Sequence, residues 1–357
     1  MLKYNSITEN LVSYTIPSTT NYKYKMDIGE FPFPQHSSVL DVVKNFNNLY
    51  TYGVVDDEFN ELLIEIKKYN NLNKDADNVL LTNGSDNALR LILDLFATSE
   101  SKLLVPTPTY VHFECMLDTK QVKQVDKPYT NYKLTNDEFN DWLLLNLENK
   151  YDLCYLVNPT MPIGHILKRE QISNILNQFP NTMFIVDEAY VEFTKNNSLS
   201  SLIEEYNNVV VVRTFSKFFG LASLRLGYLM TNEKIMKLLK PYYNYKDITK
   251  LSVGCALLSL KNYDHYDNNK KIFFEIKDFI KINLQKLVEN NKKFIDFIIN
   301  EGMFFTLICD EPSELKKYFD LHSIAVRNKN CDIKGAVRFT IIDKQAMEEV
   351  FEILNKY

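Results

Sequence analysis

Glycine is scarce in this sequence of 357 residues. Nine glycines occur where an average composition predicts about twenty-five, so each one present is more often required by backbone geometry. No two glycines are separated by a single residue, and the G-x-x-x-x-G-K-[ST] motif is also absent. The missing fingerprints exclude nicotinamide-dependent dehydrogenases of the usual type and P-loop enzymes.

Cysteines are few, and long apolar runs are absent. The five cysteines are widely spaced and include no C-x-x-C pair, which argues against a disulfide framework and a zinc site. The five histidines have no ligand-like spacing, so we predict no metal. The N-terminus has no apolar segment behind basic residues, and no run approaches the roughly 18 apolar residues that cross a bilayer. We expect an unexported protein of the cytoplasm.

Arginine is rare although basic residues are not. Of the 41 basic residues, six are arginine, at positions 90, 169, 213, 225, 327 and 338. In a chain so rich in lysine, arginine is expected mainly where its planar fork is needed. The formal net charge is -5 and the lysines are scattered, so the sequence has no basic stripe for a nucleic acid. A hydrophobic fraction of 45% is typical of a globular protein.

Short β-branched runs alternate with amphipathic stretches between about residues 78 and 230. The runs predict strands at Val79–Thr82, Lys102–Val105, Asp152–Val157, Thr182–Asp187, Val209–Thr214 and Leu224–Met230. The stretches predict helices at Ser85–Ala97, Tyr110–Leu117, Arg169–Phe179 and Leu199–Tyr206. This alternation is typical of an α/β fold with a mostly parallel sheet and helices on both faces. Ligands of such sheets bind beyond the carboxyl ends of the strands.

The two ends of the chain have a different character. After residue 232, lysine-rich helical patterns, one of them over Lys270–Asn300, precede strand-like segments at Met303–Cys309, Ser323–Arg327 and Ala336–Ile342. We therefore predict a large domain over residues 37–240 and a smaller α+β domain over residues 241–357. Residues 1–36 are polar, rich in tyrosine and interrupted by prolines, so we expect an arm that packs partly on the small domain.

Five motifs with chemically useful residues follow one another in the predicted large domain. They are N-G-S-D (Asn83–Asp86), P-T-Y (Pro108–Tyr110), N-P-T-M-P-I-G (Asn158–Gly164), D-E-A-Y (Asp187–Tyr190) and R-T-F-S-K-F-F-G-L-A-S-L-R-L-G-Y (Arg213–Tyr228). In this order and spacing the sequence resembles the fold-type I pyridoxal-phosphate (PLP) aminotransferases of class I and II, and in particular their histidinol-phosphate aminotransferase branch. The resemblance covers essentially the whole chain. It implies the fold of the type I PLP-dependent transferases and the cofactor pyridoxal 5'-phosphate.

The resemblance assigns several residues to the cofactor ring. Lys217 matches the lysine that binds the cofactor aldehyde and, once released by substrate, moves the Cα proton. Asp187 matches the aspartate that keeps the pyridine nitrogen protonated. By the same resemblance, Asn158 and Tyr190 would donate hydrogen bonds to the ring oxygen O3′, and Tyr110 would stack on the ring. The catalytic residues would thus be Lys217, Asp187 and Tyr190.

The resemblance also implies a cup for the cofactor phosphate. The residues that would form it are Gly84, Ser85, Asp86, Thr214, Ser216 and Arg225. The first three stand at the start of a predicted helix, where backbone N–H groups and the helix dipole favour an anion. In the family a tyrosine of the neighbouring subunit also reaches this phosphate, and Tyr52 is the matching residue. The resemblance therefore implies a homodimer with shared sites.

Two further arginines match residues that bind substrate in the family. Arg338 matches the arginine that grips a substrate carboxylate with both arms of its fork, and Arg327 matches one that helps bind the substrate phosphate in the histidinol-phosphate branch. Tyr14 and Glu30 are further candidates for substrate contacts. The branch usually carries N-E-N-P-[YF] near its start, whereas this chain has G-E-F-P-F over 29–33, which leaves the identity of the substrate open.

We therefore predict an aminotransferase that moves an amino group between an amino acid such as glutamate and a small phosphorylated keto or amino compound, similar to histidinol phosphate or a triose phosphate. The alternative is a decarboxylase of serine or threonine phosphate, because the bond that breaks depends on how the arginines orient the carboxylate. A non-catalytic PLP-binding regulator is an interpretation of another class. The intact Lys217 argues against it, as does the lack of a basic helix-turn-helix segment before residue 78.

Overall fold

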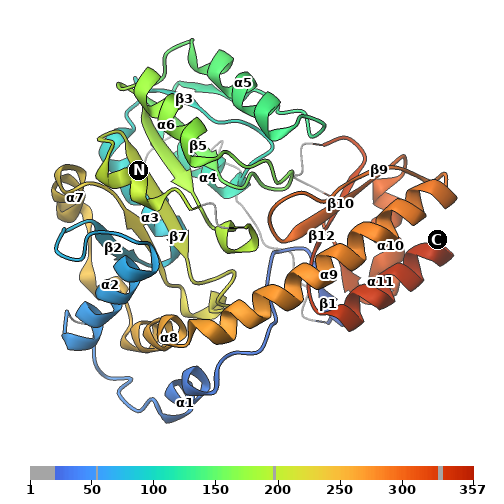
Figure 1. Cartoon of the computed structure of the whole chain (residues 1–357), viewed down its shortest axis with the longest axis horizontal. Helices are drawn as coiled ribbons and strands as arrows, with labels where there is room; N and C mark the ends of the chain where they lie inside the picture. Colours follow the sequence, from blue (N-terminus) through green and yellow to red (C-terminus); the bar gives the residue numbers. More distant parts are fainter. Residues whose placement is uncertain (1–20, 54, 196–197, 329–332) are drawn as a thin grey trace, which may run out of the picture.

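The chain forms two parts, each built around its own sheet (Figure 1). The structure is a computed structural model that describes residues 21–53, 55–195, 198–328 and 333–357. One part contains a sheet of seven strands, and the other, which includes the C-terminus, contains a sheet of three. One cluster of buried apolar side chains extends through both parts.

The large sheet follows the alternation of the sequence. Its strands, in spatial order, are β2 (Val79–Thr82), β8 (Gly227–Met230), β7 (Val209–Thr214), β6 (Met183–Asp187), β5 (Leu153–Val157), β3 (Lys102–Leu104) and β4 (Gln124–Asp126). Neighbouring strands are parallel except at β8, which runs antiparallel to both β2 and β7. β5 and β7 are buried along their whole length, as expected for strands covered on both faces. The predicted α/β fold with a mostly parallel sheet is confirmed.

Most of the helices belong to this large part. They are α1 (Ser37–Asn45), α2 (Asp57–Tyr69), α3 (Gly84–Phe96), α4 (Val111–Lys120), α5 (Asn136–Leu147), α6 (Arg169–Gln178), α7 (Glu233–Leu239) and α8 (Lys250–Lys261). Three of the four predicted helices occur as α3, α4 and α6, whereas the one predicted over Leu199–Tyr206 is a short 3-10 helix over Ser200–Glu204. The buried Glu188 accepts hydrogen bonds from the Leu199 N–H and the Ser198 hydroxyl, which fixes a tight turn there in place of an α-helix.

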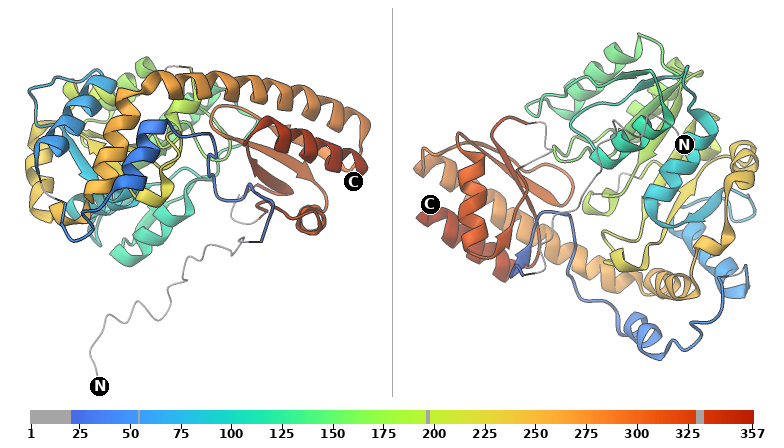
Figure 2. Two further views of the ribbon diagram at one scale, coloured as in Figure 1. Left: turned by 90° about the horizontal axis from the view of Figure 1, so that it is seen from below. Right: turned by 180° about the vertical axis from the view of Figure 1, so that it is seen from behind.

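The longest helix, α9 (Tyr263–Asn290), connects the two parts and is the long orange helix of Figures 1 and 2. The prediction of a helix over Lys270–Asn300 is wrong at both ends. Asn291 Oδ1 accepts a hydrogen bond from Lys293 N (3.1 Å), which turns the chain out of the helix, and β9 (Phe294–Ile298) then pairs in the small sheet. No helix within the described ranges is both long and apolar enough to cross a membrane.

The small sheet is antiparallel, in the order β12-β10-β9. Its other strands and the helices beside it are β10 (Phe304–Cys309), β12 (Ala336–Thr340), α10 (Pro312–Leu321) and α11 (Lys344–Lys356). β10 and β12 confirm two of the predicted strands. The third, predicted over Ser323–Arg327, contributes the two residues of β11 (Ile324–Ala325).

The described part of the N-terminal segment attaches to the small part. β1 (Tyr24–Lys25) pairs in parallel with β11, and Met26 O accepts a hydrogen bond from Thr340 N (2.9 Å) at the end of β12. Helix α8 packs against α1 and α2. We propose the limits 1–36 for the arm, 37–240 for the large domain and 241–357 for the small domain, with α8 as the portion of the last segment that packs on the large domain.

Candidate active site

A cleft of about 480 Å³ lies at the carboxyl ends of the central strands of the large sheet. Val157, Asp187 and Thr214, the last residues of β5, β6 and β7, line it, and the small sheet contributes Phe304 and Arg338. The cleft therefore occupies the place expected for a ligand of a mostly parallel sheet.

Most of the predicted site residues line this cleft. They are Glu30, Ser85, Asp86, Tyr110, Asp187, Tyr190, Thr214, Ser216, Lys217, Arg225, Arg327 and Arg338. Gly84 adjoins the cleft through Arg225, as described below. The structure thus brings together predicted residues from four of the five motifs, from the N-terminal segment and from the C-terminal segment.

Lys217 follows β7 on the large-sheet side of the cleft. Its Nζ donates a hydrogen bond to Gly29 O (3.2 Å) and lies 5.7 Å from the centre of the Tyr190 ring. Burial, together with the positive charge of Arg338, lowers the pKa of Lys217 to about 8. A larger fraction of this amine is therefore neutral near pH 7, which is the form that attacks a carbonyl carbon.

Asp187 is buried at the end of β6 and is held from two sides. Its Oδ2 accepts a hydrogen bond from the Tyr155 hydroxyl (2.8 Å), and its Oδ1 accepts one from Ala189 N (3.0 Å). Burial raises the pKa of Asp187 to about 6, and these two hydrogen bonds oppose the rise. No motif marks Tyr155 in the sequence, because it reads as one core aromatic residue within a buried strand.

Two predicted tyrosines border the same space. The Tyr110 hydroxyl donates a hydrogen bond to Asp86 Oδ1 (2.9 Å). Tyr190 is 8% exposed, and its ring lies edge-to-face with Phe304, with 5.2 Å between the ring centres. Tyr190 therefore links the end of the large sheet to the small sheet.

The first turn of α3 and Arg225 form an anion-binding cup. Gly84 has a φ of +70°, a backbone conformation that favours glycine, and the end of the Arg225 side chain lies where a Cβ would be, 2.6 Å away at Nη2. Asn83, the residue before the helix, makes no capping hydrogen bond with its side chain. Arg225 also donates a hydrogen bond to Ser216 Oγ (3.3 Å) and lies 3.6 Å from Asp86 Oδ2. A helix N-terminus beside an arginine favours a phosphate.

Arg327 and Arg338 face each other across an antiparallel bridge. The Arg327 N–H donates to Arg338 O (3.1 Å), and the Arg338 N–H donates to Arg327 O (2.7 Å). Directly opposed residues project their side chains to one face, and both of these line the cleft. Arg338 is 5% exposed, donates a hydrogen bond to Asp27 O (2.6 Å) and lies 4.5 Å from the centre of the Phe304 ring.

The N-terminal segment closes the side of the cleft near these arginines. Glu30 forms an ion pair with Lys25 (2.9 Å). Asp27 is buried, and burial raises its pKa, while its Oδ1 accepts no hydrogen bond from the described residues. Asp27 and Phe304 carry no motif in the sequence, since their place in the cleft depends on contacts between segments that are far apart in the chain.

Asn158 and Tyr52, two predicted residues within the described ranges, do not line the cleft. Asn158 is buried beside it, but its side-chain amide is engaged with the backbone of Leu167, accepting from the N–H (2.9 Å) and donating to the carbonyl (3.2 Å). Tyr52 is 71% exposed, with Lys246 Nζ 5.5 Å from its ring centre. Tyr14 lies outside the described residues. The roles assigned to all three stay predictions.

The cleft residues fit the cofactor predicted from the resemblance. The cup at Gly84, which a Cβ would fill, suits a phosphate. A buried carboxylate at Asp187 suits a protonated ring nitrogen, and the lowered pKa of Lys217 suits reaction with an aldehyde. The three features lie along one cleft, as a single small molecule with these three groups would need.

The chain is similar to known proteins over most of its length. The family model "Aminotransferase class I and II" matches residues 22–354. The dihydroxyacetone phosphate transaminase of Campylobacter jejuni is 28% identical over 338 residues, which cover 93% of this chain and 89% of that protein. The histidinol-phosphate aminotransferase of Thermoanaerobacter pseudethanolicus is 31% identical over 261 residues, which cover 71% of this chain and 73% of that protein.

A solved structure agrees with the fold. The histidinol-phosphate aminotransferase from Sinorhizobium meliloti, in complex with pyridoxal-5'-phosphate, has a TM-score of 0.84 at 19% identity, covering 100% of this chain and 98% of that chain. The predicted resemblance, the type of enzyme and the cofactor are confirmed. The chain belongs to the aminotransferase class I and II family.

Proposed function

We propose that this enzyme transfers an amino group between an amino acid such as glutamate and a small phosphorylated keto or amino compound. The observation that carries the proposal is the bridged pair Arg327 and Arg338, which shares a cleft with Lys217. Two adjacent guanidinium forks can hold two anionic groups, a carboxylate and a phosphate. Both relatives described above are named as transaminases of phosphorylated compounds, which supports the same class of substrate here.

Lys217 is the proposed base. When bound, pyridoxal phosphate supplies an electron sink that stabilises negative charge at the substrate Cα. Lys217 Nζ would accept the Cα proton and later return it, and its lowered pKa keeps neutral amine available for this task. Its contact with Gly29 O holds the amine near the N-terminal segment while it carries the proton.

The other cleft residues are proposed to bind and orient. Asp187 would hold its negative charge against the ring nitrogen, and the Tyr155 hydroxyl would keep that carboxylate oriented. Tyr110 would stack on the ring, while Tyr190 and Asn158 would donate hydrogen bonds to its oxygen. The phosphate would lie in the cup formed by Gly84, Ser85, Asp86, Thr214, Ser216 and Arg225.

The substrate side would be formed by the two arginines, with Glu30 and Tyr14 as further contacts. Arg338 would bind the carboxylate of the amino acid, and Arg327 the phosphate of the other substrate. The buried Arg338, already oriented by Asp27 O and Phe304, loses little freedom when it binds, which supports its role as the carboxylate site.

We propose a homodimer in which Tyr52 reaches the phosphate cup of the partner. Around Tyr52 a run of apolar side chains is uncovered in the single chain, with Leu49 85% and Tyr50 84% exposed. Such a patch on a soluble domain favours contact with another molecule. Mixing inactive Lys217→Ala with inactive Tyr52→Ala should restore activity in mixed dimers if sites are shared, and full activity of a monomer would contradict sharing.

We also propose that the enzyme works in the cytoplasm. Cys115, Cys154, Cys255 and Cys309 are all free thiols, which suits a reducing compartment. Fractionation of cells that produce the protein would test this proposal.

One assay tests the reaction. Purified enzyme with glutamate and dihydroxyacetone phosphate, or with 2-oxoglutarate and histidinol phosphate, should move the amino group and release no carbon dioxide. Release of carbon dioxide from serine or threonine phosphate without amino transfer would favour the decarboxylase. Tight cofactor binding with neither reaction would favour the regulator.

A further inference from the structure

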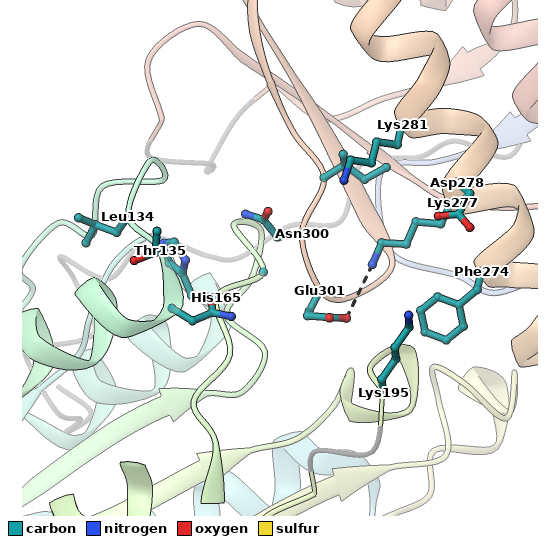
Figure 3. A pocket seen from close by; sticks show the side chains of 13 residues that line it. Leu134, Thr135, His165, Lys195, Phe274, Lys277, Asp278, Lys281, Asn300 and Glu301 are labelled. Carbon is teal, nitrogen blue, oxygen red and sulfur yellow. Dashed lines mark ion pairs between the residues drawn. The ribbon is translucent and has the colours of Figure 1, made fainter. Parts of the chain in front are cut away.

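A second cavity, of about 460 Å³, lies between the two parts of the chain (Figure 3). Its walls come from the start of α5 with the 164–165 segment, from α9, and from the 299–301 loop. No described residue lines both this cavity and the active-site cleft. Its volume is in the range of small-molecule binding sites.

Lys277 on α9 is the central charge of this cavity. Its side chain is 12% exposed, and its Nζ donates one hydrogen bond within the described chain, to Gly302 O at 3.3 Å. The carboxylate of Glu301 lies 3.9 Å away, at the limit of an ion pair, as the dashed line in Figure 3 shows. Its Nζ also lies 6.0 Å and 5.8 Å from the ring centres of Phe273 and Phe274. An ammonium group has three donors, so the single hydrogen bond leaves Lys277 able to donate to a ligand.

Two more lysines face the same space. Lys281, one turn further along α9, and Lys195, on the opposite wall, both line the cavity. Both lower the pKa of Lys277, but burial is the largest cause of its fall to about 8. The lining carboxylates, Asp278 and Glu301, are fewer than the lysines, so the cavity has a surplus of positive charge.

The remaining walls can bind the body of an organic molecule. Asn136 accepts a hydrogen bond from Ile166 N (3.1 Å) through its Oδ1, which leaves its NH₂ group as a donor. Phe274 adds an apolar ring. The buried His165 also lines the cavity, but burial lowers its pKa, so it adds no charge at neutral pH. This mixture of cations, amide donors and an apolar ring suits a small organic anion.

We propose that this interdomain cavity is a second binding site, for a small organic anion that carries a carboxylate or a phosphate group, with Lys277 as its main cation. Such a ligand would touch α9 and the large part at once. It would lie behind the chain segment 158–167, whose Met161 lines the active-site cleft and whose Gly164 lines the second cavity. The proposal does not depend on the reaction proposed above.

Titration calorimetry on the PLP-loaded enzyme, with citrate and inorganic phosphate as separate probes, tests the site. Beside any binding at the arginines of the active-site cleft, we expect one further binding event per chain that is weakened about 10- to 100-fold by Lys277→Met. The control Lys286→Met removes an exposed lysine from the same helix and should change nothing. Binding should survive in Arg327→Ala and in Arg338→Ala, each of which removes one cation of the active-site cleft. Binding of citrate alone would identify a carboxylate site, and binding of phosphate alone a phosphate site.

If Lys277→Met does not fold, the proposal is tested by binding to two other cavity variants and by the uptake of protons on binding. Asn300→Asp adds a carboxylate to the cavity and should weaken binding, as should Lys281→Met. At pH 8 Lys277, with a pKa of about 8, is about half protonated, and an anion beside it favours its charged form. Binding should therefore take up at most about half a proton per site, and this uptake should depend on Lys277. The proposal is overturned if neither probe binds at millimolar concentration. It is also overturned if binding is lost in Arg327→Ala or in Arg338→Ala but is unchanged in the three cavity variants.

Discussion

The charged side chains on the two walls of the active-site cleft are positioned by different kinds of structure. One wall, which we call the cofactor wall after its proposed role, comprises Asp187, Lys217 and Arg225, which stand on β6, just after β7 and in the turn before β8 of one sheet. The substrate wall, which comprises Asp27, Arg327 and Arg338, is assembled from the N-terminal segment and two separate strands or loops of the small part. One wall depends on a single sheet, and the other on contacts between distant segments.

Because the two walls are built differently, we expect cofactor binding and the choice of substrate to respond to changes in different parts of the molecule. Because Asp187 and the residues around Lys217 are positioned by paired neighbouring strands, changes in the small part should leave cofactor binding intact. The position of Arg338 depends on Asp27 and Phe304 as well as on its own strand, so changes there should alter the choice of substrate. Each prediction below tests this separation.

The largest effect is expected for Lys217→Ala. Amino transfer should be abolished, because no other group on the cofactor wall can both bind the aldehyde and carry the proton. In the unmodified enzyme, borohydride reduction and peptide mapping should place a pyridoxyl group on Lys217. The control Lys234→Ala, at an exposed lysine of α7, should keep full activity and the same circular dichroism spectrum. A pyridoxyl group on another lysine would contradict the assignment.

A smaller, selective effect is expected on the substrate wall. For a phosphorylated ketone without a carboxylate, Arg327→Ala should slow the ketone half-reaction about 10- to 100-fold, as expected for loss of a charged hydrogen bond. Arg338→Ala should mainly slow the half-reaction with the amino-acid donor. Single-turnover rates of each half-reaction measure both, and Arg90→Ala, at an exposed arginine of α3, is the matched control. If both variants slowed both half-reactions equally, the proposed division of roles between Arg327 and Arg338 would be wrong.

The pKa of Lys217 predicts how the enzyme without cofactor takes up pyridoxal phosphate. The neutral amine is the reactive form, and its fraction rises as the pH rises through the lowered pKa of about 8. The association rate should therefore increase about tenfold from pH 6 to 7 and level off above pH 8. Stopped-flow absorbance would record it. A rate that still climbs steeply above pH 9 would mean that Lys217 has the pKa of an ordinary lysine.

The smallest effect is expected for Tyr155→Phe. Its hydroxyl stabilises the charged form of Asp187, so its loss should raise the pKa of Asp187 above about 6. Cofactor affinity should fall as this carboxylate becomes protonated at low pH. In a plot of cofactor affinity against pH, the fall on the acid side should therefore begin about one unit higher in the variant. Tyr151→Phe removes a similar hydroxyl–carboxylate bond, to Asp126, outside the cleft and is the control. An unchanged fall on the acid side would show that Tyr155 does not act through Asp187.

The cofactor wall was largely predictable from the sequence. Asp187 and Lys217 each stand within a short contiguous motif, and the alternation of strands and helices predicts that the ends of β6 and β7 meet. Tyr155 could not be predicted, because only the pairing of β5 with β6 shows that its hydroxyl reaches Asp187. The predicted ends of helices were wrong where contacts with distant segments decide the structure. After Asn291, for example, the chain pairs in the small sheet as β9 and does not continue as a helix.

The substrate wall could be predicted only in part. Arg327 and Arg338 stand out in a chain with few arginines, but their direct pairing requires knowledge of the register of the small sheet. Asp27 and Phe304 carry no local signal. Asp27 O accepts a hydrogen bond from Arg338, 311 positions further along the chain, and Phe304 contacts Tyr190 of the large part. Both contacts arise only when segments that are far apart in the sequence come together.

Helix α9 connects the two parts of the chain, so its direction affects where the small sheet lies relative to the large one. Its 28 residues form a rod of about 42 Å, which packs against α8 near its start and against β9 and α11 further along. If the rod pivots by about 10° at its first turn, its last turn travels about 7 Å. Lys277 lies near the middle of α9 and would move about half as far as the last turn. Substitutions around Asn262, where the helix would pivot, should therefore displace the distant small sheet more than any segment near the pivot.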